Sequence, residues 1–250
     1  MNKFKNKNVL VTGAAQGIGK QIALDFAKEG ANLIILDYND EIGIQTVEEF
    51  EKDGYRSIFV KADVSEYRDL LNAKELVKEK FGEIDVLVLC AGIAQRAKVT
   101  EISMEDWQRV VNINLTGLFT TVKAFYEDLI NKQGSIVYIS SGSALSGTGG
   151  GVSYPASKAG GEGLIRGLAK EMGPLGVNVN AISPRLIDSG DMMRVNYPTK
   201  EGLDNVLKKI PVGRFGKCED VSNLTLFLAD KDNSYIHGQN ILLDGGRTIA

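Results

Sequence analysis

The chain has 250 residues, of which 43% are hydrophobic and 24% are charged, and its net charge is −3. Lysine and arginine are spread along the chain, which argues against a nucleic-acid-binding protein. With no signal-peptide pattern and no apolar run of 18 residues, we expect a cytoplasmic protein without a membrane span. One histidine and two cysteines are too few for a His/Cys metal site, so we expect no metal; His237 is expected in a solvated turn.

Apolar runs alternate with amphipathic stretches along the whole chain. Strands are expected at residues 8–13, 31–37, 56–63, 84–92, 134–141, 177–183 and 240–246. Helices are expected between them, including residues 17–29, 40–52, 66–81, 104–132 and 156–173. The alternation predicts an α/β fold: one doubly wound domain over residues 1–250, with a seven-stranded parallel sheet and helices on both faces. The irregular segment 185–215 is expected to cover a substrate, with a plain surface excursion as the alternative.

A glycine-rich loop follows the first strand and opens the first helix. Gly13, Gly17 and Gly19 are spaced G-x-x-x-G-x-G in VTGAAQGIGK. Glycines permit a tight turn and the close approach of a pyrophosphate, and a helix N-terminus offers free N–H groups and a positive dipole end. The loop therefore predicts a dinucleotide site that includes Gln16 and Ile18, with a purely structural turn as the alternative.

The second predicted strand ends in an acidic residue, Asp37. A carboxylate at this position can accept hydrogen bonds from both hydroxyls of an adenosine ribose and would repel a 2′-phosphate. The neighbours Gln16, Tyr38 and Asn39 carry no positive charge that could bind such a phosphate. The sequence therefore predicts NAD rather than NADP as the cofactor, and an ordinary turn acid is the alternative.

The stretch GVSYPASKAGG, residues 151–161, carries a phenol and an ammonium. Pro155 suits the first turn of a helix, and there Tyr154 and Lys158, four residues apart, share one face. A free phenol titrates near ~10, and a nearby ammonium together with an oxidised nicotinamide ring favours the phenolate. With Ser141 upstream, the pattern predicts proton transfer at an alcohol or carbonyl, and an ordinary helix start is the alternative.

Further motifs follow in a fixed order: Asp63-Val64, CAG at 90–92, NINLTG at 112–117, YISS at 138–141, SPRLIDS at 183–189 and LLDGG near the end. Together with the glycine loop and the Tyr-x-x-x-Lys pair, they resemble the short-chain dehydrogenase/reductase family over essentially the whole chain. The resemblance implies a Rossmann fold, a homo-oligomer (commonly a tetramer) and a catalytic tetrad of Asn114, Ser141, Tyr154 and Lys158. It also implies cofactor contacts from Asp63, Val64, Cys90, Ala91, Gly92, Tyr154, Lys158, Pro184, Ile187 and Ser189.

Two positions depart from the family pattern. Cys90 stands where the family usually has asparagine, and we expect it to be a small buried apolar residue. Arg185 stands where the family has glycine, and with Arg96 or Arg194 it is expected to bind a carboxylate, phosphate or sulfonate of the substrate. The alternatives are that Arg185 points into solvent or binds the pyrophosphate of the cofactor. The expected substrate contacts are Ser141, Ser143, Tyr154, Arg185 and Arg96.

These motifs predict an NAD-dependent oxidoreductase that interconverts a secondary alcohol and a ketone or aldehyde of a small polyol or sugar-like molecule. Within the family, the alternative is a 3-oxoacyl-[acyl-carrier-protein] reductase that uses NADPH. Asp37 and the mildly acidic charge balance argue against it. An alternative of another class is a non-catalytic NAD-sensing protein, which would be expected to have lost the tyrosine or the lysine.

Overall fold

The computed structural model, which describes residues 2–189 and 199–249, contains the predicted seven-stranded parallel sheet. Its strands lie in the order β3-β2-β1-β4-β5-β6-β9, and every neighbouring pair is parallel. The bounds are β1 (Asn8–Thr12), β2 (Asn32–Asp37), β3 (Ser57–Lys61), β4 (Val86–Leu89), β5 (Ser135–Ile139), β6 (Asn178–Pro184) and β9 (Asn240–Leu243).

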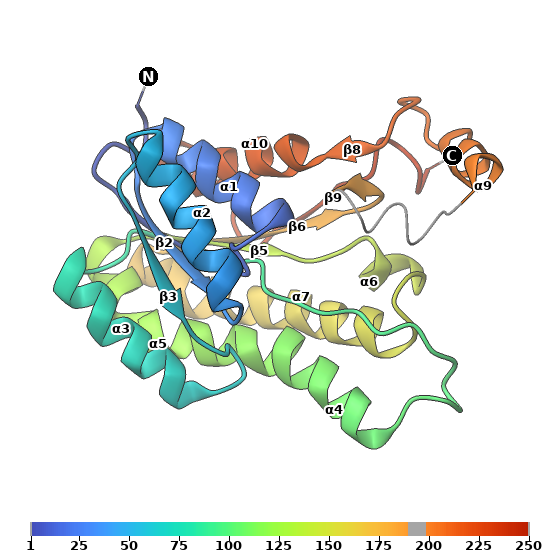
Figure 1. The fold of residues 1–250 in the computed structure, drawn as a ribbon, viewed down its shortest axis with the longest axis horizontal. Coiled ribbons are helices and arrows are strands. Elements are labelled where there is room, and N and C mark those ends of the chain that lie inside the picture. The colour runs from blue at the N-terminus through green and yellow to red at the C-terminus, as the bar shows by residue number, and fades with distance from the viewer. Residues whose placement is uncertain (1, 190–198, 250) are drawn as a thin grey trace.

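Helices cover both faces of the sheet, as the alternating pattern predicted (Figure 1). One face carries α1 (Gly17–Lys28), α2 (Asp40–Lys52) and α10 (Cys218–Ala229). The other carries α3 (Tyr67–Lys80), α5 (Gly117–Lys132) and α7 (Ser153–Met172). The doubly wound Rossmann architecture is therefore confirmed, with α10 as a helix that the predicted segments did not name.

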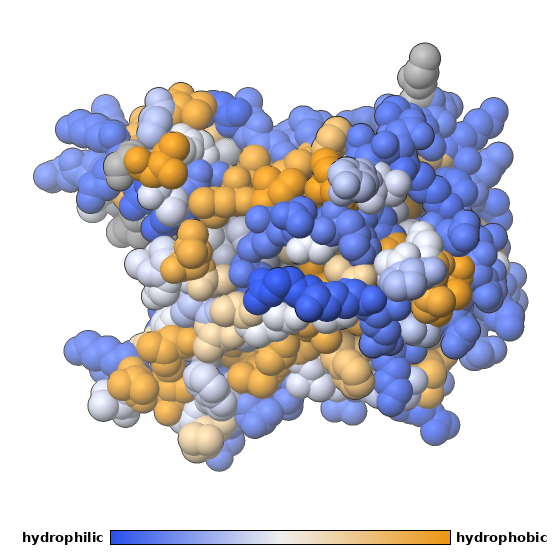
Figure 2. Space-filling view, turned by 180° about the vertical axis from the view of Figure 1, so that it is seen from behind, coloured by the Kyte–Doolittle hydropathy of each residue, from blue (hydrophilic) through white to orange (hydrophobic). Residues whose placement is uncertain are grey.

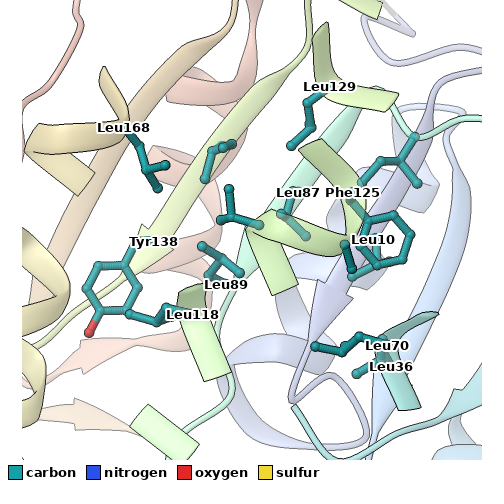
Figure 3. Close-up of a cluster of buried hydrophobic side chains, with 14 of the residues drawn as sticks. Leu10, Leu36, Leu70, Leu87, Leu89, Leu118, Phe125, Leu129, Tyr138 and Leu168 are labelled. Atoms are coloured by element: carbon teal, nitrogen blue, oxygen red, sulfur yellow. The ribbon is translucent and has the colours of Figure 1, made fainter. Parts of the chain in front are cut away.

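Two hydrophobic cores lie on opposite faces of the sheet. Along β1, Leu10 points into the core beneath α3, α5 and α7, while Val9 and Val11 point into the core beneath α1 and α10. Successive strand side chains alternate in this way because the pleat has a period of two. Figure 3 shows the first core, where Leu10, Leu87 and Phe125 interdigitate. Both faces are covered by helices, which is why the strands are mainly apolar, although β6 also carries the buried polar residues Asn180 and Ser183.

Several shorter elements complete the chain. They are α4 (Met104–Val111), a π-helical turn (Asn112–Thr116), α6 (Ser143–Ser146), β7 (Ile187–Asp188) paired with β8 (Gly216–Lys217), α9 (Lys200–Leu207) and 3₁₀ turns at Gly173–Leu175 and Lys231–Asn233. The helix predicted over 104–132 is thus divided by a π turn. Of the segment 185–215, residues 190–198, including Arg194, lie outside the described residues, so its substrate-covering role stays a prediction.

His237 has a different environment from the solvated turn that we expected. Its ring is half-buried between α7 and β6, with Nε2 2.8 Å from the carbonyl oxygen of Ala169 and Nδ1 3.1 Å from Oδ1 of Asn178. The ring therefore joins a helix end to a strand. Within the described ranges, no helix is both long and apolar enough to span a membrane.

Candidate active site

A large cleft of about 2120 Å³ lies at the carboxyl ends of the parallel strands. β1 and β4 are adjacent there although their crossovers run to opposite sides, and such switch points are where open α/β sheets bind ligands. Among the predicted site residues that the structure describes, all line this cleft except Asn114, which is fully buried behind it. Figure 2 shows the surface hollowed between two lobes at the end of the molecule where α6 and α9 lie.

The glycine loop has a backbone that only glycine tolerates well. Gly13 has a φ of +66°, and a Cβ there would lie 2.8 Å from the Cα of Ala91. A Cβ at Gly19 would clash with the carbonyl oxygen of Gly13. Gly17, at a φ of +59°, has no neighbouring atom within 4 Å of where a Cβ would be, so the loop is open at the start of α1. An open loop at a helix N-terminus fits the pyrophosphate of a dinucleotide.

Asp37 is held at the end of β2 by two backbone groups. Its Oδ2 accepts a hydrogen bond from the N–H of Ala15 at 3.0 Å, and its Oδ1 accepts one from the N–H of Asn39 at 3.0 Å. The nearby cation Lys61 is paired with Asp40 at 2.8 Å. The carboxylate therefore faces the cleft in a fixed orientation, next to the exposed side chain of Tyr38.

Thr12, a residue that our sequence analysis did not single out, fixes the loop after β4. Its Oγ1 accepts hydrogen bonds from the N–H groups of Cys90 and Ala91 at 3.0 and 3.1 Å. These bonds hold the backbone at Cys90, the position where the family usually has asparagine. The Cys90 side chain packs against the core on the α1 side, and burial raises the pKa of its thiol to about 11. The raised pKa favours the thiol over the thiolate at neutral pH, in keeping with the expected packing role of Cys90.

Asn114 lies in the π-helical turn and is fully buried. Its Oδ1 accepts from the N–H of Ile93 at 2.8 Å, while its Nδ2 donates to the carbonyl of Ile93 at 2.8 Å and to Oγ of Ser157 at 3.0 Å. The extra residue of a π turn, a feature often found at functional sites, aims this amide at the loop after β4. Asn114 therefore connects that loop to α7, which carries Tyr154 and Lys158.

Tyr154, Lys158 and Ser141 come together at the floor of the cleft. Nζ of Lys158 donates to the carbonyl of Ile139 at 2.9 Å and lies 5.8 Å from the centroid of the Tyr154 ring. The Ser141 hydroxyl lies close enough to Tyr154 to lower the pKa of the phenol, and it accepts a hydrogen bond from the N–H of Ser143 at 3.1 Å. The end of β5 and the first turns of α7 thus bring a phenol, an ammonium and a hydroxyl together at one point.

The electrostatics of this trio differ from the sequence-based expectation. Burial raises the pKa of Tyr154, and the hydrogen bond from Ser141 only partly offsets that effect. Burial also lowers the pKa of Lys158 to about 8. The expected phenolate is therefore not favoured by the protein groups alone, because the same dry environment penalises both charges.

Replacing Lys158 with methionine is expected to stabilise the protein at pH 7. A pKa reduced from 10.5 to about 8 costs the folded state about 3 kcal/mol below pH 8, and the cost disappears as pH rises towards 10.5. The lost hydrogen bond to Ile139 offsets about 1–2 kcal/mol of the gain. Urea denaturation at pH 7 and pH 10 measures the difference.

The matched control is Lys170→Met on the exposed side of the same helix, for which we expect no pH-dependent change. If the stability difference between Lys158→Met and the wild type is the same at both pH values, Lys158 is not a desolvated cation.

The predicted anion-binding residues lie at the rim and on one wall of the cleft. Arg96 is exposed and lines the cleft from the loop after β4. Arg185, directly after β6, donates from Nη2 to Oγ1 of Thr148 and from Nη1 to Oγ1 of Thr248, both at 3.3 Å. A third arginine, Arg247, also lines the cleft and was not predicted. Its only signal in the sequence is its position directly after LLDGG.

Comparisons with known proteins agree with this architecture. A family model described as enoyl-(acyl carrier protein) reductase matches residues 13–248. The 3-oxoacyl-[acyl-carrier-protein] reductase FabG of Thermotoga maritima is 38% identical, over 99% of this chain and 100% of its own. The (2S)-[(R)-hydroxy(phenyl)methyl]succinyl-CoA dehydrogenase subunit BbsD of Thauera aromatica is 36% identical, over 98% of each chain.

A solved structure from Beutenbergia cavernae is similar over nearly its whole length. It is provisionally assigned as an NAD(P)-dependent gluconate 5-dehydrogenase and holds NADP at low occupancy. The two chains superpose with a TM-score of 0.92 at 30% identity, covering 100% of this chain and 99% of the other.

The chain belongs to the short-chain dehydrogenase/reductase family. It is accordingly an oxidoreductase of alcohol and ketone substrates that binds NAD(P).

Proposed function

We propose that this protein uses NAD to oxidise a secondary alcohol, or to reduce the corresponding carbonyl, on a small anionic polyol or sugar-like substrate. The observation that carries the proposal is the convergence of Tyr154, Lys158 and Ser141 on the floor of a cleft that begins at the glycine loop. This arrangement supports chemistry at the hydroxyl or carbonyl of a bound substrate.

NAD is the proposed cofactor because of Asp37. Both carboxylate oxygens are tied to backbone N–H groups, so the negative charge stays at the end of β2. A ribose 2′-hydroxyl would donate to this carboxylate, whereas a 2′-phosphate would meet a like charge. The neighbouring Lys61 is occupied by Asp40, which supports the preference further.

The proposed catalytic step is a proton transfer by Tyr154. The Ser141 hydroxyl would hydrogen-bond the substrate oxygen and stabilise charge that develops on it. Tyr154 would take the hydroxyl proton during oxidation and return it during reduction. When bound, the nicotinamide accepts or supplies the hydride and, in its oxidised form, adds the positive charge that the phenolate needs. Lys158 would hold the cofactor ribose. Asn114 links α7 to the loop after β4 through its hydrogen bonds to Ser157 and Ile93.

An anionic substrate is proposed because Arg185 hydrogen-bonds only the neutral hydroxyls of Thr148 and Thr248 among the side chains of residues 2–189 and 199–249. The Asp244 carboxylate interacts with its charge but is itself bound to the backbone N–H groups of Gly246 and Thr248. Its stem packs on Gly142, the residue after Ser141, where a Cβ would lie 2.9 Å from the Cβ of Arg185. A carboxylate, phosphate or sulfonate would give this guanidinium a bidentate partner. The provisional gluconate assignment of the Beutenbergia cavernae structure is in keeping with an acidic sugar.

A second candidate is reduction of a 3-oxoacyl thioester with NADPH. It is favoured by the 38% identity to FabG of Thermotoga maritima over the full length of both chains. The charge at Asp37 argues against the cofactor of this alternative, so the two candidates differ in both substrate and cofactor.

The test is reduction of NAD by the purified protein against a panel of secondary alcohols. The panel pairs neutral polyols and sugars with carboxylated, phosphorylated and sulfonated counterparts, and each assay is repeated with NADP. Reduction of a 3-oxoacyl thioester is assayed separately with NADH and with NADPH. We expect turnover with NAD and with the anionic members. Turnover only of 3-oxoacyl thioesters with NADPH would assign the second candidate, and turnover of neutral compounds alone would remove the anionic part of the proposal.

The variant Asp37→Ser tests the proposed cofactor independently of the proposed substrate. We expect it to reduce the preference for NAD over NADP, measured as the ratio of kcat/KM values on the same alcohol. An unchanged ratio would show that Asp37 does not set the cofactor preference.

A further inference from the structure

Arg247, on the turn after β9, has an unusual environment. It is half-buried and lines the cleft, and its Nε and Nη1 atoms are buried without any hydrogen-bond partner among the described residues 2–189 and 199–249. A guanidinium remains charged at every physiological pH. Burying such a charge unpaired is costly, so buried guanidinium groups are normally found with an anion.

The turn that carries Arg247 is held in place by hydrogen bonds to its own backbone. Asp244 accepts from the N–H of Gly246 at 2.9 Å through Oδ1 and from the N–H of Thr248 at 2.8 Å through Oδ2. Gly245 and Gly246 have φ values of +64° and +85°, which L side chains rarely adopt. The Asp244 carboxylate therefore stabilises the turn, and the Arg247 side chain projects from a fixed backbone.

Arg185 is joined to the same turn. Its N–H donates to the carbonyl of Leu243 at 3.0 Å, and its Nη1 reaches Thr248, the neighbour of Arg247. Its other terminal nitrogen reaches Thr148, on the loop between α6 and α7. Arg185 and Arg247 thus both line the cleft and are linked through this turn, and the stem of Arg185 packs on Gly142, the residue after Ser141.

An anion bound by Arg185 and Arg247 could be the pyrophosphate of the cofactor or an anionic group of the substrate. The pyrophosphate of a dinucleotide is provided for by the open loop around Gly17 at the start of α1. Arg185 instead packs on Gly142, beside Ser141, where the substrate oxygen is proposed to bind, and Arg247 lies on the turn to which Arg185 is hydrogen-bonded. An anion on the substrate is therefore the better match.

We propose that Arg247 and Arg185 together form a subsite for an oxyanion of the substrate (a carboxylate, phosphate or sulfonate). Arg247 is the specificity-determining residue of this subsite because its Nε and Nη1 atoms are buried and have no hydrogen-bond partner in the part of the chain that the structure describes. The proposal rests on the proposed function and deepens it by naming the group that the cleft recognises and the residue that selects it.

The experiment compares Arg247→Gln and Arg247→Lys with the wild type, using a matched pair of an anionic alcohol and its neutral counterpart. We expect Arg247→Gln to reduce the ratio of kcat/KM for the anionic over the neutral substrate about 10- to 100-fold, as expected for loss of charge-assisted hydrogen bonds. Arg247→Lys should recover part of the ratio, because a point charge remains but the planar fork is lost. The control is Arg68→Gln, an exposed arginine on α3 outside the cleft, which should leave the ratio unchanged.

A second readout does not depend on turnover. Calorimetric titration with inorganic sulfate and phosphate at constant ionic strength should detect binding to the wild type and at least tenfold weaker binding to Arg247→Gln. If no alcohol is oxidised with either cofactor, the proposed function fails, and the titration still decides whether the subsite exists. Equal anion binding by the wild type and Arg247→Gln would overturn the subsite.

Two further outcomes would replace the substrate as the occupant. A larger Kd for NAD in Arg247→Gln, with an unchanged ratio of kcat/KM for the anionic over the neutral substrate, would assign the arginine to the cofactor pyrophosphate. A change of oligomeric state in Arg247→Gln, measured by light scattering, with an unchanged substrate ratio, would assign it to a contact with a second copy of the chain.

Discussion

Replacing Tyr154 with phenylalanine is expected to lower kcat for alcohol oxidation by about 10²- to 10⁴-fold, the usual contribution of a general acid or base. The variant loses only the hydroxyl, so the ring still fills its position beside Lys158 and the cofactor site is unchanged. We therefore expect NAD to bind with nearly the same Kd. Steady-state assays give kcat, and calorimetry gives the Kd.

The matched control is Tyr126→Phe. The hydroxyl of Tyr126 lies on the surface, where it donates to Glu171 at 3.0 Å, and its removal should leave kcat unchanged. A wild-type protein that binds NAD but oxidises no alcohol, together with an indifferent Tyr154→Phe variant, would favour the NAD-sensing alternative. A loss of turnover that is matched by a loss of NAD binding would argue that Tyr154 has a structural role.

The second large effect is expected at Asn114. In Asn114→Leu, the N–H and carbonyl of Ile93 lose their partner, whereas the Ser157 hydroxyl keeps its hydrogen bond to the carbonyl of Tyr154. Each unsatisfied group costs about 1–3 kcal/mol, so we expect the free energy of unfolding to decrease by about 2–6 kcal/mol. Urea denaturation of the cofactor-free protein measures this directly, independently of catalysis.

Asn112→Ala is the control in the same π turn. Its side chain accepts a hydrogen bond from Gln108 near the surface, and its loss should change the stability by less than about 1 kcal/mol. A decrease below about 1 kcal/mol in Asn114→Leu as well would mean that the bonds to Ile93 and Ser157 are dispensable, and that Asn114 serves catalysis alone.

Much of the fold follows from local patterns in the sequence. The strands are short apolar runs that need both faces covered, and alternation with helical segments leaves a parallel sheet as the solution. Gly13 could be identified without the structure because a turn between strand and helix requires a positive φ. Pro155 likewise lies in the first turn of α7, as its missing N–H requires. Each of these features depends on only a few neighbouring residues.

The predicted site residues come together because they follow the ends of neighbouring strands. Asp37, Cys90 and Ser141 are far apart in the sequence but line one cleft at the carboxyl edge of the sheet. A parallel sheet brings all its carboxyl ends to that edge, so their grouping could be anticipated from strand order. Their catalytic and binding roles remain proposals for the variants to test.

Local rules of backbone and side-chain chemistry were enough to predict the strands, most of the helices and the glycine turn, but not α10 or the π turn within 104–132. Other features depend on contacts in three dimensions. Contacts between distant segments give the Cys90 backbone its support from Thr12 and raise the pKa of Tyr154. They also bury Nε and Nη1 of Arg247, for which the described residues offer no hydrogen-bond partner. Burial and hydrogen bonding depend on which groups surround an atom in space, and spacing along the chain does not specify those neighbours.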